Sequence, residues 1–382
     1  MKKFLDCISV VGTTPSRFQG TKKYVSTGAV ATTEIDESEV VEVTYEDRPS
    51  RANLSAEAGD ILFAKMQGTR KTLLLDSETE ENIYSTGFYA VRANPEVITT
   101  ECLYYLVDSE LFLTQKDKHC SGATQKAITN GGLAKIEIRI PPLSEQGVLT
   151  EKLRYLTQLI ADKRKQLELF DEVIKSRFIE MFGDPVLNPQ GWKTKPLLEM
   201  GNCKNGMNFH DGDEGVEINC LGVGDFKDLA IIDKTYELPT ISLNEAPPKE
   251  YLLKDGDIVF VRSNGNKALV GRCLVVYPHD TPTTYSGFCI RYRLTTDELE
   301  TQYLLRVLKT ESIRKKMAGR GANIQNLNQQ ILASLIIPIP PKGLQQQFAT
   351  FVEQIDKSKF EIQQSLEKLE ILKKSLMQQY FG

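Results

Sequence analysis

Hydrophobic side chains recur three and four residues apart along two long stretches of this 382-residue chain. This spacing places them in one stripe along an α-helix and is typical of a coiled-coil seam of about four heptads. We therefore predict two long helices that pair through these stripes. The apolar positions are Leu153, Leu156, Ile160, Leu167, Phe170 and Ile174 in the first stretch and Val352, Ile355, Ile362, Leu366, Leu369 and Leu376 in the second.

Further apolar residues lie beside each stripe, so each helix is expected to bury more than one face. This flanking surface could receive another protein. Two separate amphipathic helices, each packed on its own domain, are the alternative. A helix of this length, at about 1.5 Å per residue, would overhang a small domain, which disfavours that arrangement. The flanking residues are Leu159, Val173, Phe178, Ile371 and Leu372.

The two stretches belong to one repeated unit. Ile-Pro-Pro begins at Ile140 and again at Ile339, and Phe-Gly ends at Gly183 and again at Gly382, so the offset is 199 residues at both ends. Proline fixes φ and lacks an N–H, so each Pro-Pro pair ends a strand. The period far exceeds the roughly 20–50 residues of solenoid repeats. A whole module, globular part plus helix, is therefore present twice.

The globular parts are predicted to contain both strands and helices. Strand-like runs lie at 23–25, 40–44, 60–64, 72–75 and 88–92, and 102–113 has helical spacing. In the second half 256–260, 286–288 and 303–308 correspond to 59–63, 86–88 and 103–108. Elsewhere the halves differ, which indicates one fold with two different surfaces.

The expected fold class is therefore mixed α/β, with two similar domains and a pseudo-two-fold internal repeat. The predicted boundaries are 1–143 for the first domain, 144–183 for the first long helix, 184–342 for the second domain and 343–382 for the second long helix.

Composition supports an ordinary globular protein, with 41% hydrophobic and 26% charged residues. No apolar run approaches the roughly 18 residues of a membrane span, and the first residues do not resemble a signal peptide. Seven cysteines without a CxxC pair indicate free thiols in a reducing cytoplasm. A net charge of −4 neither requires nor excludes nucleic acid.

Motifs for catalysis were not found. The sequence has no phosphate loop of the GxxxxGK[ST] type, no glycine pattern of a methyl-donor site and no Asn-Pro-Pro-aromatic motif. None of its three histidines stands at metal-ligand spacing with cysteine. We therefore predict no catalytic residue, no metal and no cofactor on this chain, and an enzyme is the least favoured class.

Polar loops after strands and after helices form the candidate binding surface. Lysine and arginine contact phosphates, whereas arginine, asparagine and glutamine can read base edges. Each loop alone could be a solvated turn, but similar loops recur at the same place in both halves, which favours binding. The candidates are Lys65, Gln67, Arg70, Lys71, Lys116, Lys118, Gln125 and Lys126 in the first half and Arg262, Asn264, Asn266, Lys267, Arg314, Lys315, Lys316, Arg320, Asn323 and Gln325 in the second.

With these features the whole chain resembles the specificity (S) subunits of type I restriction–modification systems. The most specific motifs are IPPLSEQ at 140–146, which leads into the first long helix, MFGDP at 181–185 and NPQGW at 188–192. The second copy departs from the pattern, because 341–345 lacks an acidic residue corresponding to Glu145.

This resemblance implies that each globular part is a target recognition domain that reads one half of a split, asymmetric site in double-stranded DNA. It implies an antiparallel coiled coil that sets the spacer between the half-sites. The implied partners are two methyltransferase (M) subunits and restriction (R) subunits. Methyl donor, ATP and Mg²⁺ then belong to these partner subunits, and the specificity subunit itself is not catalytic.

A helix of this length, roughly 55 Å, is consistent with half-sites more than one DNA turn apart. The competing hypothesis is a coiled-coil scaffold that does not bind DNA. It predicts no salt-dependent duplex binding.

Overall fold

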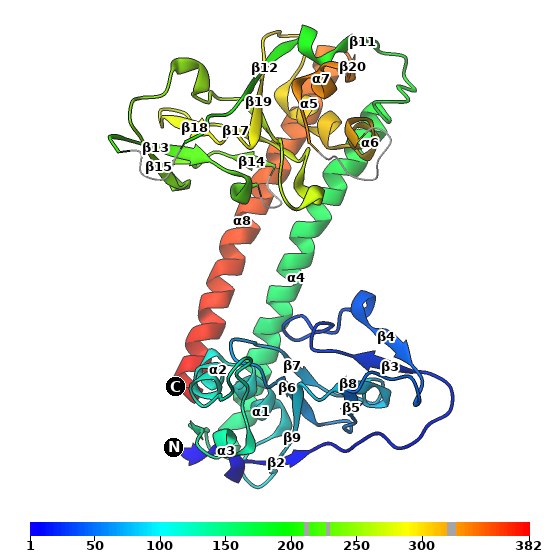
Figure 1. The fold of residues 1–382 in the computed structure, drawn as a ribbon, viewed down its shortest axis with the longest axis vertical. Coiled ribbons are helices and arrows are strands. Elements are labelled where there is room, and N and C mark those ends of the chain that lie inside the picture. Colours follow the sequence, from blue (N-terminus) through cyan, green and yellow to red (C-terminus); the bar gives the residue numbers. More distant parts are fainter. Residues whose placement is uncertain (210–213, 227–229, 319–325) are drawn as a thin grey trace. The chain divides into compact units, whose positions relative to one another are not determined.

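The computed structural model describes residues 1–209, 214–226, 230–318 and 326–382 (Figure 1). It divides into two compact units. Unit 1 comprises Met1–Lys165 and Ile362–Gly382, and unit 2 comprises Gln166–Glu361. The two long helices, α4 (Leu143–Phe182) and α8 (Lys342–Phe381), have 40 residues each. Each therefore contributes one part to each unit, whereas the predicted boundaries placed both helices outside the globular domains.

Unit 1 has two four-stranded sheets. The central strand β6 (Ile61–Ala64) is buried at all four positions and pairs antiparallel with strands on both sides. Its sheet has the order β2 (Ile8–Val11), β9 (Phe88–Ala93), β6, β7 (Thr72–Leu74). The second sheet has the order β4 (Val41–Val43), β3 (Lys22–Val25), β8 (Ile83–Ser85), β5 (Ala52–Leu54). The remaining elements are the paired strands β1 (Lys2–Lys3) and β10 (Glu137–Ile138) and the helices α1 (Thr100–Val107), α2 (Glu110–Lys118) and α3 (Asn130–Leu133).

Unit 2 repeats this plan with different sheet sizes. Its central strand is β16 (Asp257–Val261), which is buried throughout. The larger sheet has the order β12 (Gly201–Asn205), β19 (Cys289–Leu294), β16, β17 (Cys273–Val276), β14 (Ile231–Ile232). The smaller has the order β15 (Thr240–Leu243), β13 (Val216–Leu221), β18 (Thr283–Tyr285). The remaining elements are the paired strands β11 (Lys193–Pro196) and β20 (Ile336–Ile339) and the helices α5 (Thr301–Lys309), α6 (Glu311–Ala318) and α7 (Gln329–Ala333).

The mixed α/β class and the duplication are confirmed, and the five strand-like runs of the first half all lie on strands. The helical spacing at 102–113 instead belongs to two helices, α1 and α2. The buried Ser109 separates them, because its Oγ accepts a hydrogen bond from the Phe112 N–H at 3.1 Å and donates one to the Leu106 carbonyl at 2.6 Å. A serine in this role starts a new helix. Among the described residues, no helix has the length and apolar character needed to cross a bilayer.

A buried glutamine fixes the start of each long helix. Gln146 accepts a hydrogen bond from the Thr99 N–H (2.8 Å) and donates to the carbonyls of Val97 (3.1 Å) and Pro141 (3.0 Å). Both its amide oxygen and its amide nitrogen are thus satisfied inside the protein, as burial of a polar group requires.

Gln345 makes the same three bonds in unit 2. It accepts from the Glu300 N–H (2.8 Å) and donates to the carbonyls of Glu298 (3.0 Å) and Pro340 (2.8 Å). Both glutamines are fully buried and lie 199 positions apart. Each long helix is therefore tied at its first turn to the globular part that precedes it.

The last turn of each long helix is buried as well. Phe182 of α4 belongs to the core of unit 2, where its ring packs edge-on against Tyr303 and Phe348. Phe381 of α8 belongs to the core of unit 1, together with Leu153. Each Phe-Gly motif therefore marks a helix end that is anchored in a core.

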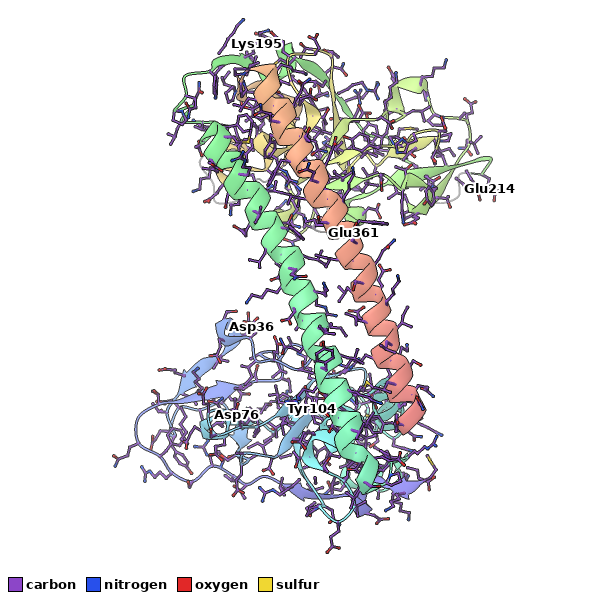
Figure 2. All side chains as sticks on the ribbon, turned by 180° about the vertical axis from the view of Figure 1, so that it is seen from behind. Asp36, Asp76, Tyr104, Lys195, Glu214 and Glu361 are labelled. Atoms are coloured by element: carbon purple, nitrogen blue, oxygen red, sulfur yellow. The ribbon has the colours of Figure 1, made fainter. Side chains whose placement is uncertain are left out.

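The two helices run antiparallel within each unit. In unit 1 Arg164 pairs with Glu370 at 2.6 Å, and in unit 2 Asp171 pairs with Lys359 at 2.6 Å. Glu361, labelled in Figure 2, is the last residue of unit 2 along α8. All twelve predicted seam residues are buried or partly buried. Of the flanking apolar residues, Phe178 is in the core of unit 2, Leu159 is partly buried, and Val173, Ile371 and Leu372 are exposed.

We expect Gln146→Leu to destabilise unit 1 by about 2–4 kcal/mol, because it leaves one buried N–H and two carbonyls without partners. Urea unfolding of the purified protein would measure this loss. Gln364→Leu, at an exposed position of α8, is the matched control and should change stability by less than about 0.5 kcal/mol. Equal effects of the two substitutions would contradict an anchoring role.

Candidate nucleic-acid interface

A basic hollow lies at the carboxyl end of β6 in unit 1. Its volume is about 410 Å³. Four cationic side chains line it, those of Arg51, Lys65, Lys71 and Lys126, and none of the described lining residues is acidic. A concave surface whose charges are all positive concentrates anions. Phosphate groups are the natural anionic ligands of lysine and arginine. The predicted residue Gln125 lines the same hollow.

Lys65 is held where three chain segments meet. Its backbone N–H donates to the Gly87 carbonyl at 2.9 Å, and its own carbonyl accepts from the Ile128 N–H at 2.9 Å. Its ammonium donates to the Thr86 carbonyl at 2.9 Å and lies 4.5 Å from the ring centre of Tyr89. Burial lowers the pKa of Lys65. A phosphate nearby would favour its charged form.

The prediction that Lys116 contacts DNA needs correction. Its side chain is only 2% exposed. Its ammonium donates to the carbonyls of Met66 (2.7 Å), Thr69 (3.1 Å) and Ala64 (3.4 Å). Lys116 therefore supports the turn after β6 from the inside, because α2 directs this side chain towards the turn and away from solvent.

Arg70 also lies away from the basic hollow. It pairs bidentately with the buried Asp108, with Nε–Oδ1 at 3.2 Å and Nη2–Oδ2 at 2.9 Å. The pair lines a different hollow of about 500 Å³, which Lys373 and Lys374 of α8 also line. The arginine is thus engaged in an ion pair inside unit 1, and the structure does not bring it together with Lys65.

The other two candidates of unit 1 are exposed. Gln67 is close to α2, where its side-chain amide donates to the Asp117 carbonyl at 3.4 Å. Lys118 is the last residue of α2. Arg51 was missed in the sequence, since it stands in an unpatterned polar stretch. Only the pairing of β5 with β8 brings it to the hollow, where its carbonyl accepts from the Thr86 N–H at 2.9 Å.

Arg262 occupies in unit 2 the place that Lys65 occupies in unit 1. Its N–H donates to the Phe288 carbonyl at 2.7 Å, and its carbonyl accepts from the Leu327 N–H at 2.8 Å. Its guanidinium donates to the Gly287 carbonyl at 3.3 Å. A cation directly after the buried central strand, clamped by the same two neighbouring segments, is therefore common to both units.

The two asparagines after Arg262 shape their own turn. Asn264 accepts from the Asn266 N–H at 2.8 Å, and Asn266 accepts from the Ala268 N–H at 3.1 Å. Lys267, in the same turn, is exposed. These contacts use the side-chain oxygens of both asparagines to hold the loop.

Helix α6 carries three more candidates. Arg314 donates to the Val270 carbonyl at 3.3 Å and so supports the segment before β17. Lys315 is exposed and pairs with Glu311 at 2.6 Å, and Lys316 is exposed. The predicted residues Arg320, Asn323 and Gln325 lie outside the described residues.

The correspondence of 86–88 with 286–288 is wrong by one residue. Strand pairing aligns Ala64 with Phe88 in unit 1 and Val261 with Cys289 in unit 2. Phe288 therefore stands where unit 1 has Gly87. The letters Gly-Phe recur in both halves, but the register of the hydrogen bonds decides which residues are equivalent.

The family profile of the type I restriction modification DNA specificity domain matches residues 12–169 and again residues 189–373. The chain belongs to this family. The resemblance inferred from the sequence is thereby confirmed, and the two matches coincide with the two halves of the repeat. This specificity-domain protein is also similar to individual relatives across most of its length.

The specificity subunit of the type I restriction enzyme StySPI from Salmonella potsdam is 25% identical over 292 residues, which cover 71% of this chain and 62% of that protein. The EcoKI specificity subunit from Escherichia coli K12 is 23% identical, with 78% and 67% covered. The MjaIX specificity subunit from Methanocaldococcus jannaschii is also 23% identical, with 70% and 68% covered.

Two solved structures share the fold. A chain from a structure that describes complex assembly and conformational transition of the type I R-M system has a TM-score of 0.60 at 21% identity, with 99% of this chain and 96% of that chain covered. The type I restriction–modification S subunit from M. genitalium has a TM-score of 0.57 at 14% identity, with 100% and 95% covered. The specificity-domain fold therefore extends over the full length of the protein.

We expect Lys116→Met to loosen the turn after β6, because three carbonyls each lose a hydrogen bond from the Lys116 ammonium. Amide hydrogen exchange across residues 64–71 should accelerate about tenfold or more, which corresponds to about 1.4 kcal/mol. Met317 already occupies the corresponding buried place on α6, so methionine fits this type of site. Lys118→Met on the same helix is the control and should leave the exchange unchanged. Unchanged exchange in Lys116→Met would refute the supporting role.

Proposed function

We propose that this protein is the DNA-sequence-specificity subunit of a type I restriction–modification complex, in which each unit reads one half of a two-part site in double-stranded DNA. The observation that carries the proposal is that both units hold a cation in the same backbone arrangement, while the side chains around that cation differ. Lys65 and Arg262 are clamped in the same way after equivalent strands, whereas their neighbours differ.

Electrostatics supports nucleic acid as the ligand despite the net charge of −4. The charge that matters is local, and the hollow of unit 1 has four cations with no acidic residue among its described lining. Phosphate contacts of this kind supply affinity and fix register, while arginine, asparagine and glutamine discriminate base edges. The protein then recognises DNA and performs no chemistry. Methyl transfer and cleavage, with their methyl donor, ATP and Mg²⁺, belong to partner subunits.

The long helices set the spacer between the half-sites in this proposal, as an antiparallel coiled coil. Its support is that both ends of each helix are fixed. Gln146 and Gln345 anchor the first turns, and Phe182 and Phe381 are buried at the last turns. If the helices are anchored in this way, a change in helix length should change the spacer and leave the DNA-reading surface of each unit unaltered.

Two methyltransferase subunits are the proposed partners of the helices, and restriction subunits join the same complex. Val173 and Leu372 are equivalent in the repeat and are 44% and 53% exposed. Exposed apolar side chains at equivalent positions offer the same contact twice, once in each unit, and so suit two copies of one partner. The expected location of such a complex is the cytoplasm.

The double substitution of Arg51 and Lys126 by alanine should weaken duplex binding by the complex with the methyltransferase. Both side chains are exposed, so the fold should be kept. The slope of log K against log salt should become shallower by about 0.9 for each lost phosphate contact. Lys22 and Lys23, paired with Glu81 and Glu37, serve as the matched double control. If the complex showed no salt-dependent binding to duplex DNA, the scaffold hypothesis would be favoured instead.

Methylated adenines mapped across a genome, after expression with the neighbouring methyltransferase, should reveal a bipartite motif with a fixed spacer. Insertion of one heptad after Lys165 and one after Glu361, where the two units divide, should lengthen this spacer by about 3 base pairs, since seven residues add about 10.5 Å. Both half-site sequences should stay as they were. A continuous short motif, or half-sites altered by the insertion, would refute the proposal.

A further inference from the structure

Phe288 is an exposed aromatic residue on a rigidly held backbone. The residue is 61% exposed. Its carbonyl accepts from the Arg262 N–H at 2.7 Å, and its N–H donates to the Ser286 hydroxyl at 3.3 Å. The next residue, Cys289, is fully buried at the start of β19. The ring is therefore presented to solvent by a fixed main chain.

Phe288 differs from an ordinary exposed phenylalanine because it occupies the position equivalent to a residue that lines the basic hollow of unit 1. The two hydrogen bonds that tie Arg262 to residues 287 and 288 correspond to those that tie Lys65 to residues 86 and 87. Phe288 thus takes the place of Gly87, which lines the basic hollow of unit 1. The aromatic ring stands on the surface that is proposed to face DNA.

Unit 1 leaves little room for a side chain at this place. A Cβ added to Gly87 would lie 2.9 Å from the Thr27 methyl group and 3.3 Å from the Ser85 hydroxyl. Any larger residue would require these neighbours to move. The difference between glycine and phenylalanine is therefore built into the packing of the two units.

The chemistry of a phenyl ring limits what it can recognise. The ring offers no conventional hydrogen bond, whereas the guanidinium of Arg262 beside it can donate to base edges. On the major-groove edges of the base pairs, the 5-methyl group of thymine is the apolar feature. We propose that Phe288 makes an apolar contact with the 5-methyl group of a thymine in the half-site read by unit 2. This inference rests on the proposed function, and it leaves unit 1 to read its half-site without an aromatic at that place.

The test uses the complex with the methyltransferase and duplexes that carry the mapped motif. Each thymine of the half-site assigned to unit 2 is replaced in turn by uracil, which lacks only the methyl group. For the wild type, one of these replacements should weaken binding about fourfold, the value of one buried methyl group. Phe288→Ala should bind the thymine duplex about fourfold or more weakly and should no longer distinguish it from the uracil duplex at that position.

Phe288→Leu retains an apolar side chain and should restore part of the discrimination. Phe360→Ala removes another exposed phenylalanine, 58% exposed on α8, and should leave discrimination at the wild-type level. An unchanged unfolding midpoint for Phe288→Ala would show that the fold is kept.

The inference is overturned if Phe288→Ala distinguishes thymine from uracil as the wild type does, or if no thymine of that half-site responds to the replacement. A weaker affinity for every duplex, with the thymine-to-uracil ratio unchanged, overturns it as well. A wild-type complex that shows no bipartite motif would instead refute the proposed function itself, so the two failures can be told apart.

Discussion

The architecture depends on one buried amide that is used twice. Gln146 and Gln345 each satisfy one N–H and two carbonyls, and these groups join the Pro-Pro segment, the loop before α1 or α5 and the first turn of a long helix. Without these bonds, three buried backbone groups in each unit would lack partners. The direction in which each helix leaves its globular part is therefore fixed by hydrogen bonding as well as by apolar packing.

The two units share the elements that surround this anchor and differ in the side chains next to the cation after the central strand. The central strand and the cation that follows it are shared. Both units also have a buried aspartate at the start of that strand, which pairs with a partly exposed arginine of the neighbouring strand: Asp60 with Arg92 and Asp257 with Arg293. The residues that differ lie next to the cation. Gly87 gives way to Phe288, and the buried Lys116 of α2 gives way to Met317 of α6. A shared backbone arrangement with different side chains beside the cation suits recognition of two different half-sites.

Much of the fold could be predicted from the sequence, but individual site residues were harder. The strand runs and both long helices were found because alternation and three–four spacing are local signals. Lys116 and Arg70 were assigned to the binding surface because they are charged and lie in polar loops that recur in both halves, yet one supports a turn and the other pairs with Asp108. Arg51 had no local signal, since a cross-strand pairing places it at the hollow.

The sequence by itself determined the duplication, the two long helices and the family, because repeats, periodicity and motifs are local features of the chain. The tertiary structure alone decided which cations share a hollow, which lysine is buried and which residue of unit 2 replaces Gly87. These features depend on strand register and on the face that each helix turns inward. Both are set by contacts between residues far apart in sequence, so a one-residue shift in pairing changes the equivalent side chain without changing any local pattern.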